Sequence, residues 1–272
     1  MIRYWRALVA ILWREVLRFL QQRERFFAAL VRPLIWLIVF AAGFRAIFGI
    51  SIQPPYETYI TYDIYIVPGL VGMIQLFNGM QSSLSMVYDR EMGSMRVLLT
   101  TPLPRWFLLG AKLFAGAVVS LLQVYAFLII AGLFGITFEP AGYALALPVL
   151  LFTGVMLGAL GMFVSSFIRQ LENFAGVMNF VIFPLFFLSS ALYPLWRMQE
   201  SNAILYQVCR WNPFTHAVET IRFALYASVE PLSLAIVIGS AALFLTASIL
   251  GYSPSRGMPT TAAGAPGRAA AS

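Results

Sequence analysis

The sequence is poor in charged residues and has too little polar surface for a soluble globule. Of its 272 residues, 11% are charged and 60% are hydrophobic, which is typical of an integral membrane protein. The net charge of +7 would suggest nucleic acid as a partner of a soluble protein. Here the basic residues cluster next to apolar stretches, where they set membrane topology instead. We therefore expect membrane lipid, and no nucleic acid, around this chain.

The scarcity of cysteine and histidine excludes several kinds of site. Cys209 is the only cysteine, so an intramolecular disulfide and a cysteine-based zinc site are excluded, and we interpret it as a small packed hydrophobe. His216 is the only histidine, and no HExxH, GxSxG or carboxylate cluster accompanies it. We interpret His216 as a polar loop residue. The sequence also lacks GxxxxGK[ST], so it has no P-loop for ATP. We expect no catalytic, cofactor-binding or metal-binding residue.

Six long apolar stretches predict an all-α fold with six transmembrane helices. We place these spans at residues 33–48, 64–87, 106–136, 143–167, 173–195 and 231–252, the first being lengthened inward from Phe26. Pro33 is expected to be the first residue of its helix. We expect a turn at residues 66–70 within the second span, and a kink at Pro184 near the middle of the fifth.

The second to sixth predicted spans contain no Asp, Glu, Lys, Arg or His at membrane depth. Such a charge would cost at least about 2.5 to 3.5 kcal/mol and is usually kept for a function, as in proton- or ion-coupled carriers. The sequence also lacks paired interrupted segments of the kind found in inverted-repeat carriers. A carrier is therefore disfavoured. The fourth span has Gly154, Gly158 and Gly161, which permit close approach of a neighbouring helix.

The segments outside these spans have distinct compositions. Residues 2–25 predict an interfacial helix, whose polar sector holds Arg3, Arg14, Arg18, Gln21 and Arg25 and whose apolar sector holds Trp5, Leu8, Leu12, Val16 and Phe19. Residues 196–230 predict two amphipathic pieces in the outer leaflet, separated by the helix breaker at residues 211–213. Residues 253–272 are rich in Pro, Gly, Ala and Thr and read as a disordered tail.

The distribution of basic residues predicts the orientation. Of the 18 Lys and Arg residues, the six-span topology assigns only four to the outside: Arg45, Arg197, Arg210 and Arg222. The loop that contains Glu57 and Asp63 has no basic residue. By the positive-inside rule, both termini lie in the cytoplasm.

A polar stretch at residues 87–112 interrupts the apolar pattern between the second and third spans. Met92, Met95, Leu98 and Leu99 recur at helical spacing. Asp89 and Glu91 come first and Arg96 follows, which is the order that a helix macrodipole favours. Pro102 and Pro104 forbid continuation. We predict a short cytoplasmic helix on which a partner acts, and a solvated loop between spans is the alternative.

Four stretches together resemble the permease subunits of type 2 ABC exporters, the ABC-2 superfamily. They are IVPGLVGM from Ile66, REMGSMRVLLTTPLPRWFLLGAKL from Arg90, FVIFPLFFLSSALYPL from Phe180 and WNPFTHAVETIRFALYA from Trp211. No single stretch is specific, but their order and their placement relative to the predicted spans match the family. The resemblance covers nearly the whole chain except the tail.

The resemblance implies an ABC-2 type transmembrane domain at residues 1–252. It implies a homodimer in the bacterial inner membrane, driven by a separate ABC ATP-binding subunit, that exports a substrate which the sequence does not identify. It assigns residues 1–25 to an elbow helix, 90–101 to a coupling helix and 196–222 to extracellular helices that cap the exit. The residues expected to contact the ATPase are Arg90, Glu91, Met92, Met95, Arg96, Leu98 and Thr101, and those expected at the dimer interface or pathway are Pro184 and Leu188.

The rival interpretation is a channel-forming or membrane-scaffold protein without ATP coupling. A carrier or a membrane enzyme is a third and more distant alternative. A gene for a P-loop ATPase beside this one would favour the exporter.

Overall fold

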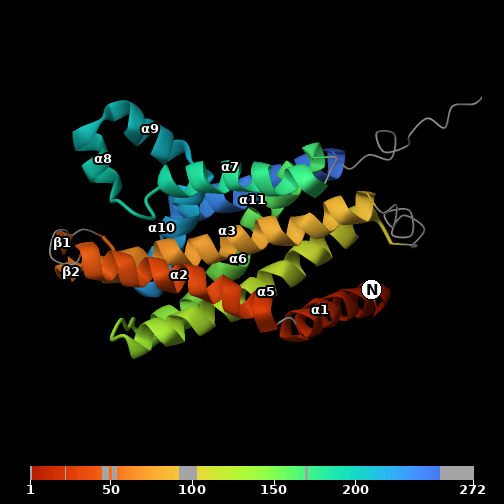
Figure 1. Ribbon diagram of the computed structural model, residues 1–272, viewed down its shortest axis with the longest axis horizontal. Coiled ribbons are helices and arrows are strands. Elements are labelled where there is room, and N and C mark those ends of the chain that lie inside the picture. The colour runs from red at the N-terminus through yellow and green to blue at the C-terminus, as the bar shows by residue number, and fades with distance from the viewer. Residues whose placement is uncertain are drawn as a thin grey trace, which may run out of the picture.

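The computed structural model describes residues 2–21, 23–44, 49–50, 54–91, 103–168 and 171–251, which are almost entirely helical (Figure 1). The helices are α1 (Ile2–Gln21), α2 (Arg23–Phe44), α3 (Tyr62–Glu91), α5 (Arg105–Leu133), α6 (Pro140–Phe167), α7 (Leu171–Phe187), α8 (Leu195–Ser201), α9 (Ala203–Trp211), α10 (Pro213–Leu225) and α11 (Pro231–Gly251). Two short strands, β1 (Gly49–Ile50) and β2 (Ile60–Thr61), pair antiparallel before α3.

Three of these helices are long and apolar enough to cross a membrane, over Trp106–Leu133, Pro140–Phe167 and Pro231–Gly251. Shorter apolar stretches, Ala29–Phe40 and Gly176–Phe187, lie within α2 and α7. Together with the composition, these helices make the chain a multi-pass membrane protein.

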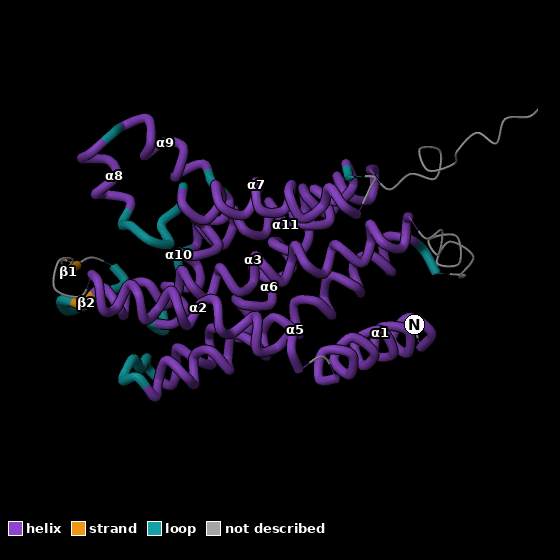
Figure 2. The backbone as a smooth tube through the Cα atoms, viewed as in Figure 1, coloured by secondary structure: helices purple, strands orange, loops and turns teal. Residues whose placement is uncertain are grey.

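The long helices lie side by side, and their ends define two ends of the molecule (Figures 1 and 2). One end carries β1 and β2, the turn between α5 and α6, and a hairpin formed by α8 and α9. The other end carries α1 and the C-terminal end of α3. Helix α1 packs mainly against α5, whereas α8 and α9 pack mainly against each other.

Helix α6 is the centre of the bundle and packs against α3, α5, α10 and α11. The contact between α3 and α6 is close because glycines face each other across it. A Cβ at Gly161 would lie 2.7 Å from the carbonyl oxygen of Gly79, and a Cβ at Gly79 would lie 2.8 Å from that of Leu157. The close approach predicted for Gly154, Gly158 and Gly161 is confirmed, since a Cβ at either of the first two would meet a neighbouring side chain at 3.1 Å.

Two predictions about proline in the first half of the chain are wrong. Pro33 does not begin a helix but lies inside α2, which starts at Arg23, so the N-terminal surface helix ends at Gln21 rather than at Arg25. The expected turn at residues 66–70 is helical, with Pro68 inside α3. In both cases proline removes one backbone donor, and a helix packed among neighbours can continue past that loss.

The second half of the chain departs from prediction after the middle of α7. This helix ends at Phe187 instead of Leu195, so Pro184 lies in its last turn and not near a kinked middle. Three helices follow where two amphipathic pieces were expected. The predicted breaker is confirmed: Asn212 caps both α9 and α10, and Pro213 is the first residue of α10.

The amphipathic helix α1 has three faces rather than two. Leu8, Leu12, Val16 and Phe19 from the predicted apolar sector are half-buried or buried, on the side that packs against α5. A second apolar face remains exposed, with Trp5 67% and Trp13 64% accessible. Arg3, Arg14 and Arg18 are also exposed. The helix can therefore attach to the bundle and still present tryptophan to the headgroup layer.

Candidate functional site

Two of the predicted ATPase-contacting residues fall at the end of the molecule that carries α1 (Figure 1). Arg90 and Glu91 are in the last turn of α3. The other five, Met92, Met95, Arg96, Leu98 and Thr101, lie outside the described residues. Their assignment to a coupling helix therefore stays a prediction.

The predicted dimer or pathway residues lie on and just after α7. Pro184 is exposed and Leu188 is half-buried. Around Pro184, α7 also exposes Phe180, Phe183 and Phe187. The ring of Phe187 lies 6.4 Å from that of Trp36, which places the exposed side of α7 next to α2. This surface is apolar and suits either lipid or a second copy of the chain.

At the opposite end, side chains hold the segment 185–192, which includes the end of α7, by its backbone carbonyls. The hydroxyl groups of Tyr62 and Tyr65 donate to the carbonyl oxygens of Leu192 and Ser190 at 2.8 and 2.9 Å. The amide of Asn212 donates to the carbonyl oxygens of Leu185 and Leu188, at 2.8 and 2.6 Å. We call residues 185–192 the pinned segment. It is fixed to α3 on one side and to the junction of α9 and α10 on the other.

A close backbone contact adds to these hydrogen bonds. A Cβ on Gly69 of α3 would lie 2.4 Å from the carbonyl oxygen of Ala191. Only glycine allows the backbone of the pinned segment to approach α3 so closely. Pro68 and Gly69, which were predicted to form a turn, are instead part of helix α3, and the pinned segment packs against the helix at this point.

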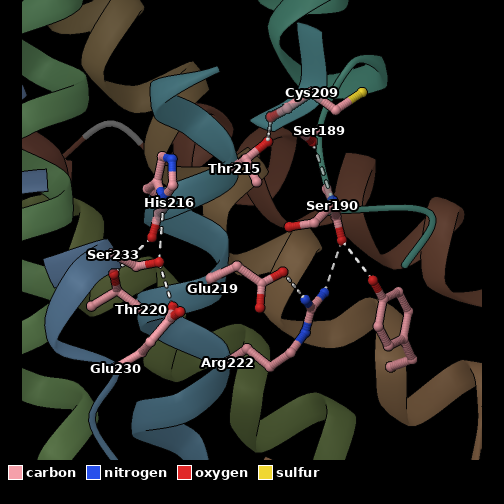
Figure 3. Close-up of polar contacts among 12 residues, drawn as sticks. Ser189, Ser190, Cys209, Thr215, His216, Glu219, Thr220, Arg222, Glu230 and Ser233 are labelled. Carbon is pink, nitrogen blue, oxygen red and sulfur yellow. Dashed lines mark hydrogen bonds and ion pairs between the residues drawn. The ribbon is translucent and has the colours of Figure 1, made fainter. Parts of the chain in front are cut away.

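A buried arginine completes the attachment (Figure 3). Arg222 on α10 is 3% exposed, forms an ion pair with Glu219, and donates to the carbonyl oxygen of Ser190 at 2.9 Å. Its guanidinium lies 4.2 Å from the centre of the Tyr65 ring. From the sequence, Arg222 is expected only to be one of the basic residues outside the membrane. The spacing of Glu219 and Arg222 on one helix face was the available signal for the pair.

The surroundings of Arg222 keep it charged. Burial lowers the pKa of Arg222, but Glu219 and the neighbouring Tyr56 and Tyr65 outweigh burial and raise it. Burial raises the pKa of Tyr226 to about 12, with Arg222 acting in the opposite direction. The centre therefore pairs a permanent cation with neutral phenols at physiological pH.

Uncharged polar side chains join α3, α5 and α6 within the bundle. The amide of Gln75 donates to the carbonyl oxygen of Leu150 at 2.7 Å, and Thr153 donates to Gln75 Oε1 at 2.7 Å. Asn78 on α3 donates to Gln123 on α5. Helices α6 and α11 carry no Asp, Glu, Lys, Arg or His along their whole lengths. Hydrogen bonds of neutral side chains therefore help to hold α3, α5 and α6 together.

Comparison with known proteins identifies the family. The family model described as ABC-2 type transporter matches residues 6–226. The chain belongs to the ABC-2 type transporter family. The matched region includes the glycine contact between α3 and α6, the pinned segment and Arg222. This ABC-2 protein is accordingly a transport permease and not a catalytic enzyme, and ABC-2 permeases in general work with ABC ATP-binding subunits.

Curated relatives have names consistent with this family. The chain is 28% identical over 211 residues to the putative transport permease ycf38 of Cyanophora paradoxa, which covers 75% of this chain and 70% of the relative. It is 30% identical over 168 residues to the probable multidrug ABC transporter permease YbhR of Escherichia coli (strain K12), covering 59% and 43%. It is 22% identical over 212 residues to nodulation protein J of Rhizobium leguminosarum bv. viciae, covering 77% and 79%.

Proposed function

We propose that this ABC-2 protein is the permease subunit of an ATP-driven exporter. It works as a homodimer with a separate ATP-binding subunit, crosses the bacterial inner membrane six times, and keeps both termini in the cytoplasm. The substrate pathway lies between the two permeases. The surface helix α1 serves as the elbow helix, residues 90–101 as the coupling helix and α8 to α10 as the extracellular helices at the exit.

The observation that carries this proposal is the length of α3 and α5. They contain 30 and 29 residues, so each is about 44 to 45 Å long at 1.5 Å per residue. A hydrocarbon core is only about 30 Å thick. Two helices of this length therefore have about ten residues each to spare, enough to carry residues 90–101 to a partner beyond the membrane surface. The basic residues of α1, at the same end of the molecule, support placing that end in the cytoplasm.

The exposed apolar surface next to Trp36 and Phe187 supports the homodimer. Helices α2 and α7 meet there, and α2 adds further exposed apolar side chains: Phe27, Val31, Ile35, Ile38 and Val39. A partner copy that packs on this surface would bring two Leu188 residues to the interface. Cysteine crosslinking at Leu188 should therefore join two permeases, and failure at both Leu188 and Phe183 would contradict this interface.

The coupling role is tested with Met95→Glu and Arg96→Glu. We expect Met95→Glu to reduce co-purification of the ATP-binding subunit, because a charge replaces an adaptable apolar contact. We expect Arg96→Glu to reduce transport more than permease yield, because it reverses a charge that sets the register of docking. Gln207→Glu on the exposed face of α9 is the matched control and should change neither.

Permease yield without the ATPase separates coupling from folding. If residues 90–101 pack on the permease itself, both variants will lower that yield even when the ATPase is absent. Normal ATPase binding and transport by both variants would rule out the coupling role and leave the channel or scaffold as the better interpretation. Topology is checked by labelling single cysteines introduced in place of native residues. Cysteines at Glu57, Glu139 and Gln199 should be labelled from outside, and cysteines at Ser94 and Ser255 only from inside.

A further inference from the structure

His216 lies at a junction of three elements (Figure 3). It belongs to α10, and its Nε2 is 2.9 Å from the carbonyl oxygen of Arg210 near the end of α9. Its Nδ1 is 3.2 Å from Oγ of Ser233 in the first turn of α11. The Ser233 hydroxyl in turn donates to the carboxylate of Glu230. We call His216, Ser233 and Glu230 the latch.

Counting hydrogen atoms shows that the latch needs one more proton than its groups ordinarily carry. A carbonyl oxygen only accepts, so His216 Nε2 must carry a hydrogen atom to bond with Arg210. In a neutral ring Nδ1 is then a bare acceptor. Ser233 has a single hydroxyl hydrogen, which goes to Glu230. The contact between Nδ1 and Ser233 therefore contains no hydrogen unless an additional proton is bound.

We propose that the closed latch is a proton-binding site, with the proton on Nδ1 of His216. Both ring nitrogens then donate, Ser233 accepts from His216 and donates to Glu230, and every contact contains one hydrogen atom. The alternative position for the proton is Glu230. Glu230 is the less suitable position, because it immediately precedes α11, whose N-terminus stabilises a negative charge, and its carbonyl accepts the first helical bond from Leu234 at 3.1 Å. A cation and an anion thus meet through one hydroxyl group.

Few other charged groups lie on the elements packed against α10. Helices α6 and α11 carry no acidic or basic side chain, although α6 carries Tyr143. Helix α9 contributes Tyr206, Cys209 and the exposed Arg210, and α3 contributes Asp63, Tyr62 and Tyr65. On α10 itself, Glu219 is engaged by Arg222. Glu230 is therefore the carboxylate that reaches His216.

The latch connects proton binding to the attachment of the α8 and α9 hairpin. Arg210 is the penultimate residue of α9. The bond from His216 therefore connects the base of this hairpin to α10, and the contact with Ser233 extends the connection to α11. The closed form binds one proton more than the open form. Lower pH therefore favours closure and higher pH favours opening, by up to about tenfold in their ratio for each pH unit. That the latch senses the pH outside the cell rests on the proposed topology.

Histidine NMR tests the proposal directly, because His216 is the only histidine of the chain. The full-length permease is purified without the ATPase, through a histidine-free tag, after labelling with ¹⁵N-histidine. The wild type should show both ring nitrogens protonated in the closed latch, with the charge lost as pH rises. A neutral ring with Nδ1 as a plain acceptor throughout the titration would overturn the proposal.

Glu230→Gln is the decisive variant because it supplies a permanent hydrogen atom in place of the proton. The glutamine amide can donate to Ser233, which frees the Ser233 hydroxyl to donate to Nδ1 of a neutral His216. We expect the ring to lose its charge at a lower pH than in the wild type. Amide exchange at the end of α9, corrected for its intrinsic pH dependence, should remain slow across the range. In the wild type the same protection should fall as pH rises.

Ser233→Ala serves as the matched control, since it breaks the relay but keeps both titratable groups. It should weaken protection at the end of α9 at every pH. If Glu230→Gln and the wild type titrate alike, the proposal is wrong. Because the measurement needs neither ATPase nor transport, its result is independent of whether the exporter function is correct.

Discussion

Replacing Gly161 by alanine should force α3 and α6 apart. The new Cβ would lie 2.7 Å from the carbonyl oxygen of Gly79 and 3.1 Å from Cα of Met80, whereas ordinary contact begins at 3.4 Å. The obstructing atoms belong to the backbone of α3 and cannot rotate away. The helices must therefore separate locally by about 0.7 Å, a gap that forfeits a substantial part of the dispersion energy of the surrounding contacts.

The expected cost follows from this overlap. Overpacking a closely packed site costs about 1 to 3 kcal/mol. Removing a helical glycine returns up to about 1 kcal/mol, but a control that removes another helical glycine cancels this gain. Gly239→Ala in α11 is such a control, because no atom beyond its own neighbours in the helix lies within 4 Å of its Cβ position. A difference of about 2 kcal/mol between the two variants corresponds to roughly 4 to 8 °C in melting temperature.

The assay is thermal unfolding of the two purified variants in the same detergent, followed by size-exclusion recovery. We expect Gly161→Ala to melt below the wild type and Gly239→Ala to melt at or slightly above it. Equal melting temperatures for the two variants would show that the contact between α3 and α6 is loose enough to absorb a methyl group. The glycine argument for this interface would then fail.

Three other substitutions test the polar contacts. Arg222→Met should destabilise the fold by about 3 to 5 kcal/mol and strongly lower the folded yield, because Glu219 is left without its partner. Adding Glu219→Gln should recover part of that yield. Gln75→Leu should cost only about 1 to 2 kcal/mol in stability, because the Thr153 hydroxyl can donate instead to the carbonyl oxygen of Val149, 3.0 Å away. Asn212→Ala removes the cap of α10 and two bonds to the pinned segment. It should cost about 2 to 4 kcal/mol and speed amide exchange around Leu188, and unchanged exchange there would contradict the pinning.

Features that depend on the residues of a single helix were predicted well from the sequence. The spacing of apolar residues located the long helices, and the three glycines of α6 correctly indicated a close contact. The partner of that contact was not predictable, because Gly79 lies elsewhere in the chain and periodicity does not identify which helices meet. Pro33 and Pro68 were misread for a similar reason: local rules count the lost donor, but only the packed structure shows that the helix continues past it.

The roles of single polar residues were less predictable. His216 was interpreted as a loop residue, yet it is helical and bonded at both ring nitrogens. Arg222 was counted as an outside charge, yet it is buried. Burial of a charged group is set by long-range partners, here the carbonyl of Ser190 and the ring of Tyr65, which no local spacing reveals. The dimer contacts and the ATPase-contacting residues remain predictions.

The pinned segment is held almost entirely by acceptors that every amino acid possesses. Tyr62, Tyr65, Asn212 and Arg222 all donate to its main-chain oxygens and not to its side chains. Exposed side chains along it, such as Phe187, can therefore be exchanged without removing any of these hydrogen bonds. If this stretch borders the route of the exported compound, its chemistry can be redesigned for a different cargo while the shape of the scaffold is retained. The four donor side chains must be kept in any such redesign.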